Sequence, residues 1–305
     1  MMLESEEQLL PERTKPRNVL LSLLFSLLFP GLGQVYNGQF KKGIIFFCLL
    51  LLIPVLFGLF RGTTVFYGFL GYLLNVFFIR IYIIIDGIVV AKRQKDYVLK
   101  SYNTWYYYVL IAIVMLVVFR FYNTTWILGT RSLKTSTVSN APNFQVGDYL
   151  IADMHAYNNH EPDYGDMVVF SGPAGHLFNF RVVGMPNDRI EWIDNMISVN
   201  GKLITSTLTK PNVRGNTEVK EFEQELPNGY KHLIYKNKIL IDSTNMNVES
   251  FVVPEQSYYL LGDNRDNSYD SRYIGFIKRE DIKGRILYRF WTNTYKESLY
   301  KDFTK

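Results

Sequence analysis

The chain contains little cysteine, and this scarcity limits what can be inferred about its environment. Its 305 residues include one cysteine, Cys48. A single cysteine excludes a disulfide within the chain, so cysteine usage does not indicate the compartment. Cys48 lies in an apolar run. We expect it to be a small apolar residue that faces lipid or a neighbouring helix.

A cleavable signal peptide and a nucleic-acid partner are also not indicated. The first 13 residues, MMLESEEQLLPER, are acidic rather than basic, and no A-x-A-like site closely follows the first apolar run. The net charge is +5, and the basic residues form short clusters beside apolar runs. Such clusters are typical of proteins at a membrane surface. We therefore expect a lipid bilayer as a partner and no nucleic acid.

Apolar residues are abundant but unevenly distributed, which predicts two domains. The chain is 48% hydrophobic, and most of the long apolar runs fall within residues 1–128, while residues 129–305 have the composition of a soluble domain. A transmembrane helix needs roughly 20 apolar residues. Three runs are predicted to span a membrane, and they cover about residues 43–60, 64–91 and 104–122. A shorter run within residues 18–30 predicts an interfacial or re-entrant helix.

The basic clusters predict the orientation of these spans. They precede the first apolar run, follow it, and fill the loop before the last span; the residues are Arg13, Lys15, Arg17, Lys41, Lys42, Lys92, Arg93, Lys95 and Lys100. Three crossings place every cluster in the cytoplasm, as the positive-inside rule requires, and put the chain after Leu128 outside. A fourth crossing by the short run would place Lys41, Lys42 and the later cluster outside, so we favour three.

Two charged residues interrupt the second predicted span. Arg80 and Asp86 lie within it, and Asp86 is one or two turns from the basic end at Lys92. An ionisable residue inside a membrane is by default a candidate functional residue. We expect a structural role here, either snorkelling towards the helix end or a pair between Arg80 and Asp86.

The segment from Pro30 to Gln39, PGLGQVYNGQ, is more specific. Proline and glycine end a helix and permit a tight return of the chain, and aromatic residues are frequent at membrane interfaces. The segment resembles the PGxGQxYxG signature of small bacterial two-helix membrane modules. That resemblance implies no chemistry, so we expect a role in helix packing.

The second half of the chain predicts a mainly β fold. Short apolar and alternating runs indicate strands, at residues 148–153, 167–170, 177–183, 189–192, 196–199 and 257–261. Asn200-Gly201 and Asn228-Gly229 are typical of tight turns. The stretch at about 206–247 is polar, and we interpret it as an irregular insertion or a second lobe.

Three local sequences in this half carry a family resemblance. The first runs from Ser139 to Asp148 (SNAPNFQVGD), the second from Phe180 to Asp188 (FRVVGMPND), and the third from Gly262 to Arg272 (GDNRDNSYDSR). Their order, their spacing and their position after the last predicted span resemble signal peptidase I. The third motif matches that family at nearly every position.

The resemblance implies a β-rich domain on the outer face of a bacterial inner membrane and a serine–lysine dyad. The substrates would be exported preproteins, cleaved at their signal peptides by an endopeptidase without a metal or cofactor. The family nucleophile falls on Ser139, and the hydroxyl that helps to form the oxyanion hole falls on Thr137, joined by the backbone N–H of Ser139. In the family, Ser268, Asp270 and Arg272 support the site.

Two departures from the family pattern concern the chemistry. The nucleophile motif of the family is Ser-Met-x-Pro-Thr, whereas Asn140 and Asn143 stand here at the second and fifth positions. At the position of the family lysine stands Phe180, and no lysine lies between Lys134 and Lys202. A serine nucleophile needs a base with a pKa suited to take its proton, and phenylalanine cannot do so.

Histidines offer a weak replacement for the missing base. His176 is four residues before Phe180, about 13 Å away along an extended strand and too far for contact. His155 and His160 lie in a polar loop. We therefore expect a signal peptidase I homologue with weak or no activity, and two alternatives stay open: a non-catalytic binding protein on this fold, or a membrane scaffold.

Overall fold

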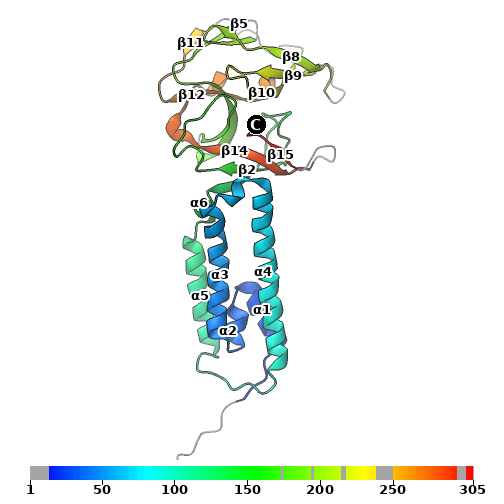
Figure 1. The fold of residues 1–305 in the computed structure, drawn as a ribbon, viewed down its shortest axis with the longest axis vertical. Coiled ribbons are helices and arrows are strands. Elements are labelled where there is room, and N and C mark those ends of the chain that lie inside the picture. Colours follow the sequence, from blue (N-terminus) through cyan, green and yellow to red (C-terminus); the bar gives the residue numbers. More distant parts are fainter. Residues whose placement is uncertain are drawn as a thin grey trace, which may run out of the picture. The chain divides into compact units, whose positions relative to one another are not determined.

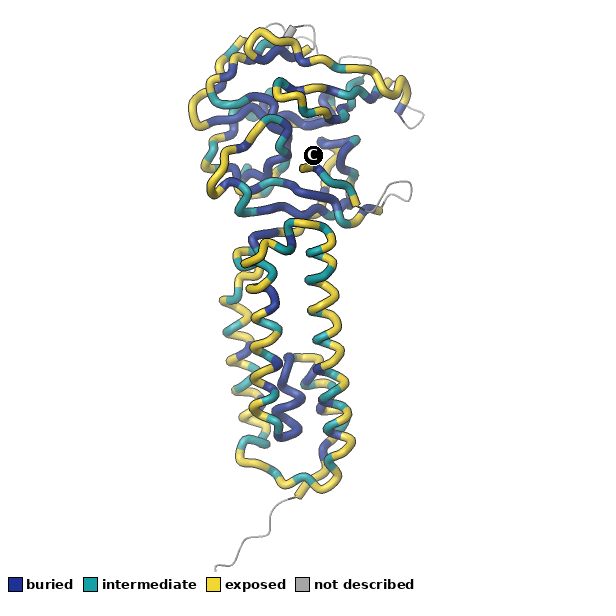
Figure 2. Tube along the Cα trace, in the orientation of Figure 1, coloured by how far each residue is buried: buried dark blue, intermediate teal, exposed yellow. Residues whose placement is uncertain are grey.

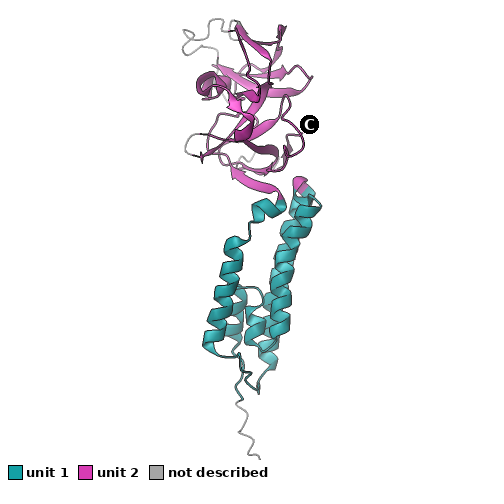
Figure 3. Cartoon of the chain, turned by 90° about the vertical axis from the view of Figure 1, so that its left-hand side faces the viewer, with its two compact units in different colours: residues 1–63, 67–128 teal, residues 64–66, 129–305 magenta. Residues whose placement is uncertain are grey.

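The structure is a computed structural model, and it describes residues 14–172, 175–193, 196–213, 218–237, 250–293 and 300–304. The chain forms two compact units, shown in different colours in Figure 3. The helical unit comprises residues 1–63 and 67–128, and the β unit comprises residues 64–66 and 129–305. The apolar runs lie in the first unit and the three motifs in the second.

The apolar runs form helices. The described α-helices before residue 129 are α1 (Val19–Leu28), α2 (Leu32–Tyr36), α3 (Phe40–Leu59), α4 (Phe66–Arg93), α5 (Trp105–Phe121) and α6 (Thr124–Leu128) (Figure 1). Asn18 begins α1, because its side chain accepts hydrogen bonds from the N–H groups of Leu20 and Leu21. After Pro30, Gly31 has a φ of 91°, a conformation that glycine adopts without steric cost.

Two of these helices are long and apolar enough to cross a membrane by length and composition. They are α3, with 20 residues, and α4, with 28 residues. The third predicted span, α5, has 17 residues, at the lower end of the range for a spanning helix. The short run forms the ten-residue α1. The arrangement with three crossings therefore stays a prediction.

The residues of the PGLGQ segment are packed and hydrogen-bonded inside the helical unit, where α2 is buried throughout (Figure 2). A Cβ added to Gly31 would lie 2.1 Å from the carbonyl oxygen of Gly43, so the backbones touch there. The Asn37 Nδ2 atom donates to the hydroxyl of Ser22 at 2.9 Å and to the carbonyl of Gly87 at 2.8 Å. These contacts fit a packing role.

One expectation about this unit is wrong. Asp86 does not pair with Arg80; it forms an ion pair with Lys42 at 2.6 Å. The Arg80 guanidinium donates instead to the carbonyl of Leu27. Folding brings α3 against α4, so the partner of Asp86 comes from another helix rather than from the preceding turns of its own.

The described residues of the β unit form three antiparallel sheets. The largest has the order β1–β2–β14–β3–β4–β12–β13, with β15 paired to β14. Its strands are β1 (Thr130–Lys134), β2 (Tyr149–Asp153), β3 (Met167–Ser171), β4 (Leu177–Gly184), β12 (Ser257–Leu261), β13 (Ile277–Lys278), β14 (Ile282–Trp291) and β15 (Lys301–Asp302). The second has the order β11–β5–β6–β7 and the third β10–β9–β8. Their strands are β5 (Arg189–Ile193), β6 (Met196–Val199), β7 (Lys202–Leu203), β8 (Ser206–Lys210), β9 (Val219–Glu225), β10 (Lys231–Asn237) and β11 (Ser250–Val252).

All six predicted strands are present, as β2, β3, β4, β5, β6 and β12. The stretch at 206–247, expected to be an insertion or a second lobe, contains strands that were not predicted, because its described residues form the sheet of β8, β9 and β10. Residues 214–217 and 238–247 of this stretch lie outside the described residues. A single helical turn, α7 (Ser271–Ile274), shows that helix is not confined to the first unit.

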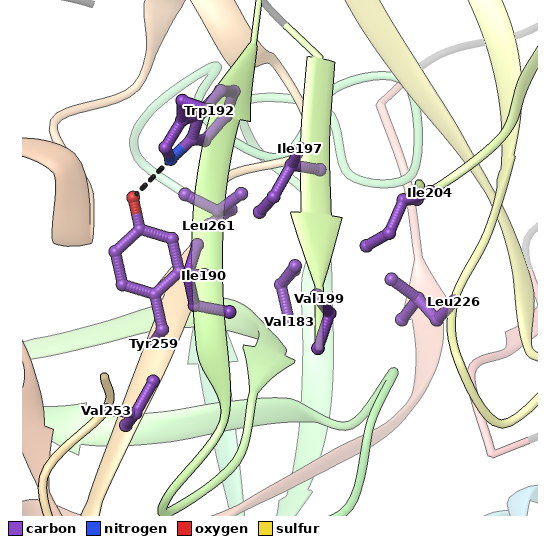
Figure 4. Packing of buried hydrophobic residues seen from close by; sticks show 10 residues of the cluster. All are labelled: Val183, Ile190, Trp192, Ile197, Val199, Ile204, Leu226, Val253, Tyr259 and Leu261. Atoms are coloured by element: carbon purple, nitrogen blue, oxygen red, sulfur yellow. Dashed lines mark hydrogen bonds between the residues drawn. The ribbon is translucent and has the colours of Figure 1, made fainter. Parts of the chain in front are cut away.

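Buried apolar residues form separate clusters in the β unit. Figure 4 shows one of them, around Ile190 on β5 and Leu261 on β12, where the Trp192 indole N–H donates to the Tyr259 hydroxyl at 3.1 Å. A second cluster joins β3, β4 and β12, and it includes Val168, Phe170, Phe180, Val182, Tyr258 and Leu260. These clusters hold β4 and β12 side by side, which fixes the spacing of the second and third motifs.

Candidate active site

The first motif is held against the third by backbone hydrogen bonds. The carbonyl of Ser139 accepts from the N–H of Asn264 at 2.9 Å, and the carbonyl of Val138 accepts from Asn264 Nδ2 at 3.1 Å. Neither the N–H nor the hydroxyl of Ser139 donates a hydrogen bond within the described residues. Ser139 is half-buried. The predicted nucleophile is thus fixed through its backbone while its side chain stays unengaged.

The second motif begins on β4, and its consecutive residues Phe180 and Arg181 face opposite sides of the sheet. Arg181 binds Asp263 in bidentate fashion, with Nε–Oδ1 at 2.8 Å and Nη2–Oδ2 at 2.7 Å. Phe180 is 4% exposed and packs in the cluster with Val182 and with Phe170, whose ring centroid is 5.8 Å from its own. The predicted base position therefore holds an apolar side chain in an apolar environment.

Gly262 connects the three motifs. Leu261 of β12 pairs with Arg181 of β4, and continuing that antiparallel register by one residue places Gly262 opposite Phe180. A Cβ added to Gly262 would lie 2.1 Å from Ser268 Oγ and 2.7 Å from the carbonyl oxygen of Ser139. Only a residue without a side chain allows this close approach. The fold therefore gathers Ser139 and Phe180, the predicted nucleophile and base positions, beside one glycine.

The hydroxyl of Ser268 is buried. Among the residues that the structure describes, its Oγ atom makes no hydrogen bond. A buried polar group without a partner costs about 1–3 kcal/mol. The hydroxyl lies beside Gly262, next to Phe180 at the predicted base position. An ammonium group at that position would supply a donor, and the phenyl ring supplies none.

Asp270 and Arg272 form the pair that we expect from the third motif. Arg272 Nε lies 2.8 Å from Asp270 Oδ1, and the side chains are 7% and 0% exposed. Asp270 also accepts from the N–H of Gly262 at 2.9 Å and begins α7 by accepting from the N–H of Arg272. Burial lowers the pKa of Arg272, but its hydrogen bonds to Asp270 outweigh this and raise the pKa above its ordinary value. The ion pair therefore fixes the carboxylate that binds the backbone N–H of Gly262.

The remaining predicted residues lie as follows. Thr137 is exposed and makes no hydrogen bond within the described residues. His176 is exposed before β4, His160 is exposed, and His155 is half-buried. Thr137 lies on the same short segment as Ser139, and its role as an oxyanion donor stays a prediction.

Sequence reasoning missed a histidine in the third sheet. His232 on β10 is 6% exposed, and its Nε2 atom lies 3.7 Å from Asp263 Oδ1. Both ring nitrogens are buried and make no hydrogen bond to the described part of the chain. Burial, followed by the charges of Arg181 and Arg265, lowers its pKa well below the usual value. His232 is therefore neutral near pH 7. The alternation of residues 231–237 is a strand signal that would have placed it.

A lysine on the same strand was also missed. Burial, followed by the charge of Arg265, lowers the pKa of Lys236 to about 8. Its neighbours bind the third motif: the N–H of Tyr235 donates to the carbonyl of Asp263 at 2.9 Å, and the N–H of Asn237 donates to Asp266 Oδ2 at 2.6 Å. The sheet of β8, β9 and β10 thus contributes ionisable groups next to the third motif.

Comparisons with known proteins identify the family of this chain. The family model described as signal peptidase, peptidase S26, matches residues 103–291, more than half of the chain. The chain belongs to this family. The resemblance to signal peptidase I expected from the three motifs is confirmed.

Individual relatives match part of the chain. A signal peptidase I of Rickettsia typhi is 36% identical over 143 residues, which is 44% of this chain and 53% of the relative. A probable signal peptidase I-2 of Synechocystis sp. is 29% identical over 175 residues, which is 55% of this chain and 65% of the relative. The crystal structure of a signal peptidase I from Enterococcus faecalis V583 matches with 28% identity and a TM-score of 0.26, covering 41% of this chain and 96% of that one. The chain spans about half the length of the Rickettsia relatives that it matches.

Proposed function

We propose that the β unit binds the signal-peptide segments of exported proteins at the site around Ser139, with little or no cleavage. Membership of the signal peptidase family supports the ligand class. The observation that carries the proposal is the side chain of Phe180, which lies in an apolar cluster at the predicted base position, while the hydroxyl of Ser139 has no acceptor within the described residues.

The chemistry explains why binding survives while cleavage does not. Attack by a serine hydroxyl requires a group that takes its proton, and a positioned base contributes roughly 10²–10⁴-fold to the rate. The backbone N–H of Ser139 is uncommitted, so with Thr137 it remains available as an oxyanion donor. Oxyanion donors and binding contacts alone leave only a small residual acceleration. The site thus keeps the groups that hold a peptide and lacks the group that activates the nucleophile.

The direct test uses the purified full-length protein in detergent with a fluorescently labelled model preprotein. We expect saturable binding and little or no release of the signal peptide over hours. The Ser139→Ala variant serves as the control for cleavage and is expected to bind equally well. Robust cleavage that disappears in Ser139→Ala would overturn the proposal, and so would the absence of any peptide binding.

We also propose that the chain is a multi-pass protein of a bacterial inner membrane with the β unit outside the cytoplasm. Two helices that pass the length and composition test support membrane insertion. The basic clusters support the orientation, because three crossings keep all of them in the cytoplasm. A reporter that works only in the cytoplasm, fused after Lys305, is expected to be inactive, while the same reporter fused after Lys95 is expected to work. Activity of the first fusion would reverse the topology.

One observation favours a second candidate, an active peptidase with a different base. Lys236 has a pKa lowered to about 8, which suits a general base, and its strand binds the third motif. If the unmodified protein cleaves, the Lys236→Met variant is expected to lose at least about 10²-fold in rate under this candidate. Lys231→Met is the matched control, because Lys231 lies on the same strand with its side chain 57% exposed. Equal rates in both variants would exclude Lys236 as the base.

A further inference from the structure

A buried arginine lies at the end of the helical unit where α1 begins and α4 ends. Arg17 is 8% exposed, and its segment runs alongside the loop that follows α4. The N–H of Arg17 donates to the carbonyl of Gln94 at 3.0 Å, and the N–H of Lys15 donates to the carbonyl of Tyr97 at 2.8 Å. The two segments are therefore paired through their backbones, which fixes the position from which the Arg17 side chain extends.

Two aromatic rings contact the guanidinium of Arg17. Its Cζ atom lies 4.7 Å from the ring centre of Tyr36 and 4.2 Å from that of Tyr97. The Tyr36 hydroxyl accepts from the N–H of Asn18 at 3.0 Å. The Tyr97 hydroxyl donates to Asn103 Oδ1 at 3.0 Å, so both rings are held in place. Cation–π contacts stabilise the charge, but a ring face does not replace the oxygen acceptors that guanidinium N–H groups have in water.

The nitrogen atoms of this guanidinium make no hydrogen bond within the described residues. Nε and Nη2 of Arg17 are buried and unpaired. Nη1 is unpaired as well, but it is not among the buried atoms, so it reaches the surface. No described carboxylate lies within ion-pair distance of Arg17, and Asp96 of the paired loop is exposed. The unpaired acceptor Gln94 Oε1 is neutral, so it cannot compensate the charge.

This combination indicates a site for an anion. A buried charge is costly unless a counter-ion meets it, and the described part of the chain supplies none to Arg17. The exposed Nη1 atom gives an anion from outside the protein a point of contact. A guanidinium presents its N–H groups as a fork that matches two oxygens of a phosphate group.

The surroundings favour a ligand with net negative charge. Lys15 and Lys95 are exposed on the two paired segments, and Lys92 and Arg93 lie in the last turn of α4. Basic sites between membrane-spanning helices on the cytoplasmic side are typical binding sites for anionic headgroups. The topology proposed above places this end of the helical unit on that side, at the depth of the lipid phosphates.

We propose that Arg17, in contact with the rings of Tyr36 and Tyr97, binds a phosphate group that carries a net negative charge. The headgroup of an anionic phospholipid and free phosphate share this chemistry, and the experiment separates them. The site goes beyond the proposed function, because all three residues lie outside residues 103–291 that the family model matches. It is independent of Ser139, so a failure here leaves the proposed peptide binding untouched.

The test is a titration of the full-length protein in a non-ionic detergent, with native mass spectrometry to count the bound molecules. The probes are phosphatidylglycerol, inorganic phosphate, and phosphatidylcholine, whose phosphate is balanced by its own choline. We expect one phosphatidylglycerol to bind at least about tenfold more tightly than phosphatidylcholine, as a hydrogen bond to a charged group predicts. Binding of inorganic phosphate without phosphatidylglycerol would keep the phosphate site and assign it to the free anion. Equal affinity for the two lipids, with no binding of inorganic phosphate, overturns the inference.

Variants assign the preference to one side chain. Arg17→Gln is expected to lose the preference for phosphatidylglycerol, and Arg17→Lys, which keeps the charge without the fork, should bind with intermediate affinity. Arg93→Gln is the matched control, because Arg93 is exposed at the same end of the unit, and its affinity should not change. If Arg17→Gln does not fold, as judged by its melting temperature, the affinity of Arg17→Lys against that of Arg93→Gln decides. A preference that is unchanged in the folded Arg17 variants overturns the inference and assigns lipid binding to the exposed basic residues.

A further variant tests the chain's own carboxylates as the counter-ion. Glutamates precede Arg17 in the part of the sequence outside the described residues, at Glu4, Glu6, Glu7 and Glu12. Their joint change to glutamine is expected to leave the affinity for phosphatidylglycerol unchanged. A gain of about tenfold in that variant would show that these carboxylates compete for Arg17, and would overturn the inference.

Discussion

Two sets of polar groups at the third motif differ in how completely they are hydrogen-bonded. We call the ion-paired residues Arg181, Asp263, Asp270 and Arg272 the support, and the residues Ser139, Phe180 and Ser268 the candidate reaction centre. In the support, Asp263 is bound twice by Arg181, and Asp270 binds Arg272 and the N–H of Gly262. In the candidate reaction centre, Ser268 Oγ is buried and makes no hydrogen bond within the described residues. Phe180, at the predicted base position, supplies no donor there, while the ion pairs of the third motif are complete. The ion pairs and the candidate reaction centre therefore rest on different side chains.

The largest effect on stability is expected when one ion pair of the support is removed. Asp270→Ala leaves the buried guanidinium of Arg272 unpaired and is expected to cost about 3–5 kcal/mol in the free energy of unfolding. Glu280→Ala breaks the exposed pair with Lys278, whose side chains are 69% and 74% exposed, and is expected to cost at most about 1 kcal/mol. Denaturant unfolding of the full-length protein in detergent measures both. Similar losses in the free energy of unfolding in the two variants would show that the ion pair of Asp270 with Arg272 does not stabilise the fold more than an exposed pair does.

The second prediction concerns the cleavage rate after a lysine is placed at the predicted base position. Phe180→Lys returns an amine to the apolar position beside Gly262, where burial lowers the pKa of a lysine towards the range of a general base. We expect cleavage of a model preprotein to rise by about 10²-fold or more, which is about 2.7 kcal/mol of transition-state stabilisation. The double variant with Ser139→Ala must remain inactive. A folded Phe180→Lys protein that still does not cleave would show that Asn140 and Asn143 have reshaped the centre as well.

Gly262 is the point where the two regions meet, so a methyl group there is expected to affect both. In Gly262→Ala the new Cβ would overlap Ser268 Oγ at 2.1 Å and the backbone oxygen of Ser139 at 2.7 Å. Overpacking of this kind costs about 1–3 kcal/mol in stability, and peptide affinity should fall because Ser139 must shift. Gly71→Ala is the control, since no atom lies within 4 Å of a Cβ at that position. Unchanged stability and affinity in Gly262→Ala would contradict the packing.

The smallest expected effect is the response of the support to pH. His232 has a folded-state pKa well below 6.5, so below pH 6.5 the unfolded chain takes up a proton that the folded chain does not. Stability is therefore expected to fall as the pH drops, by about 1 kcal/mol from His232 between pH 7 and pH 5.5.

The His232→Gln variant is expected to lose this part of the pH dependence. His160→Gln, at an exposed position, should keep it. Denaturant midpoints across this pH range measure the difference. Parallel curves for the unmodified protein and His232→Gln would show that the histidine is not held neutral by the fold.

Much of the fold was predictable from local pattern. The alternation of short apolar runs indicated six strands, and each is present. The strands β8, β9 and β10 were not predicted, because their outward face is polar and they are amphipathic rather than apolar. His232 and Lys236 were missed with it. Arg80 and Asp86 share one helix, yet Asp86 binds Lys42 of α3, a partner that no short-range rule identifies.

The sequence by itself determined which groups this protein has: a serine in a recognisable motif, an intact third motif, and no lysine between positions 134 and 202. Tertiary structure alone decided what those groups meet. Asn143 and Asp263 are hydrogen-bonded across 120 residues of sequence, and His232 approaches the same carboxylate from a third sheet. Strand and helix patterns arise from neighbours a few residues apart, since they follow the backbone period. Partners, burial and shifted pKa values depend on segments that only packing brings together, and for that reason the burial of the Ser268 hydroxyl and the packing of Phe180 became visible only in the fold.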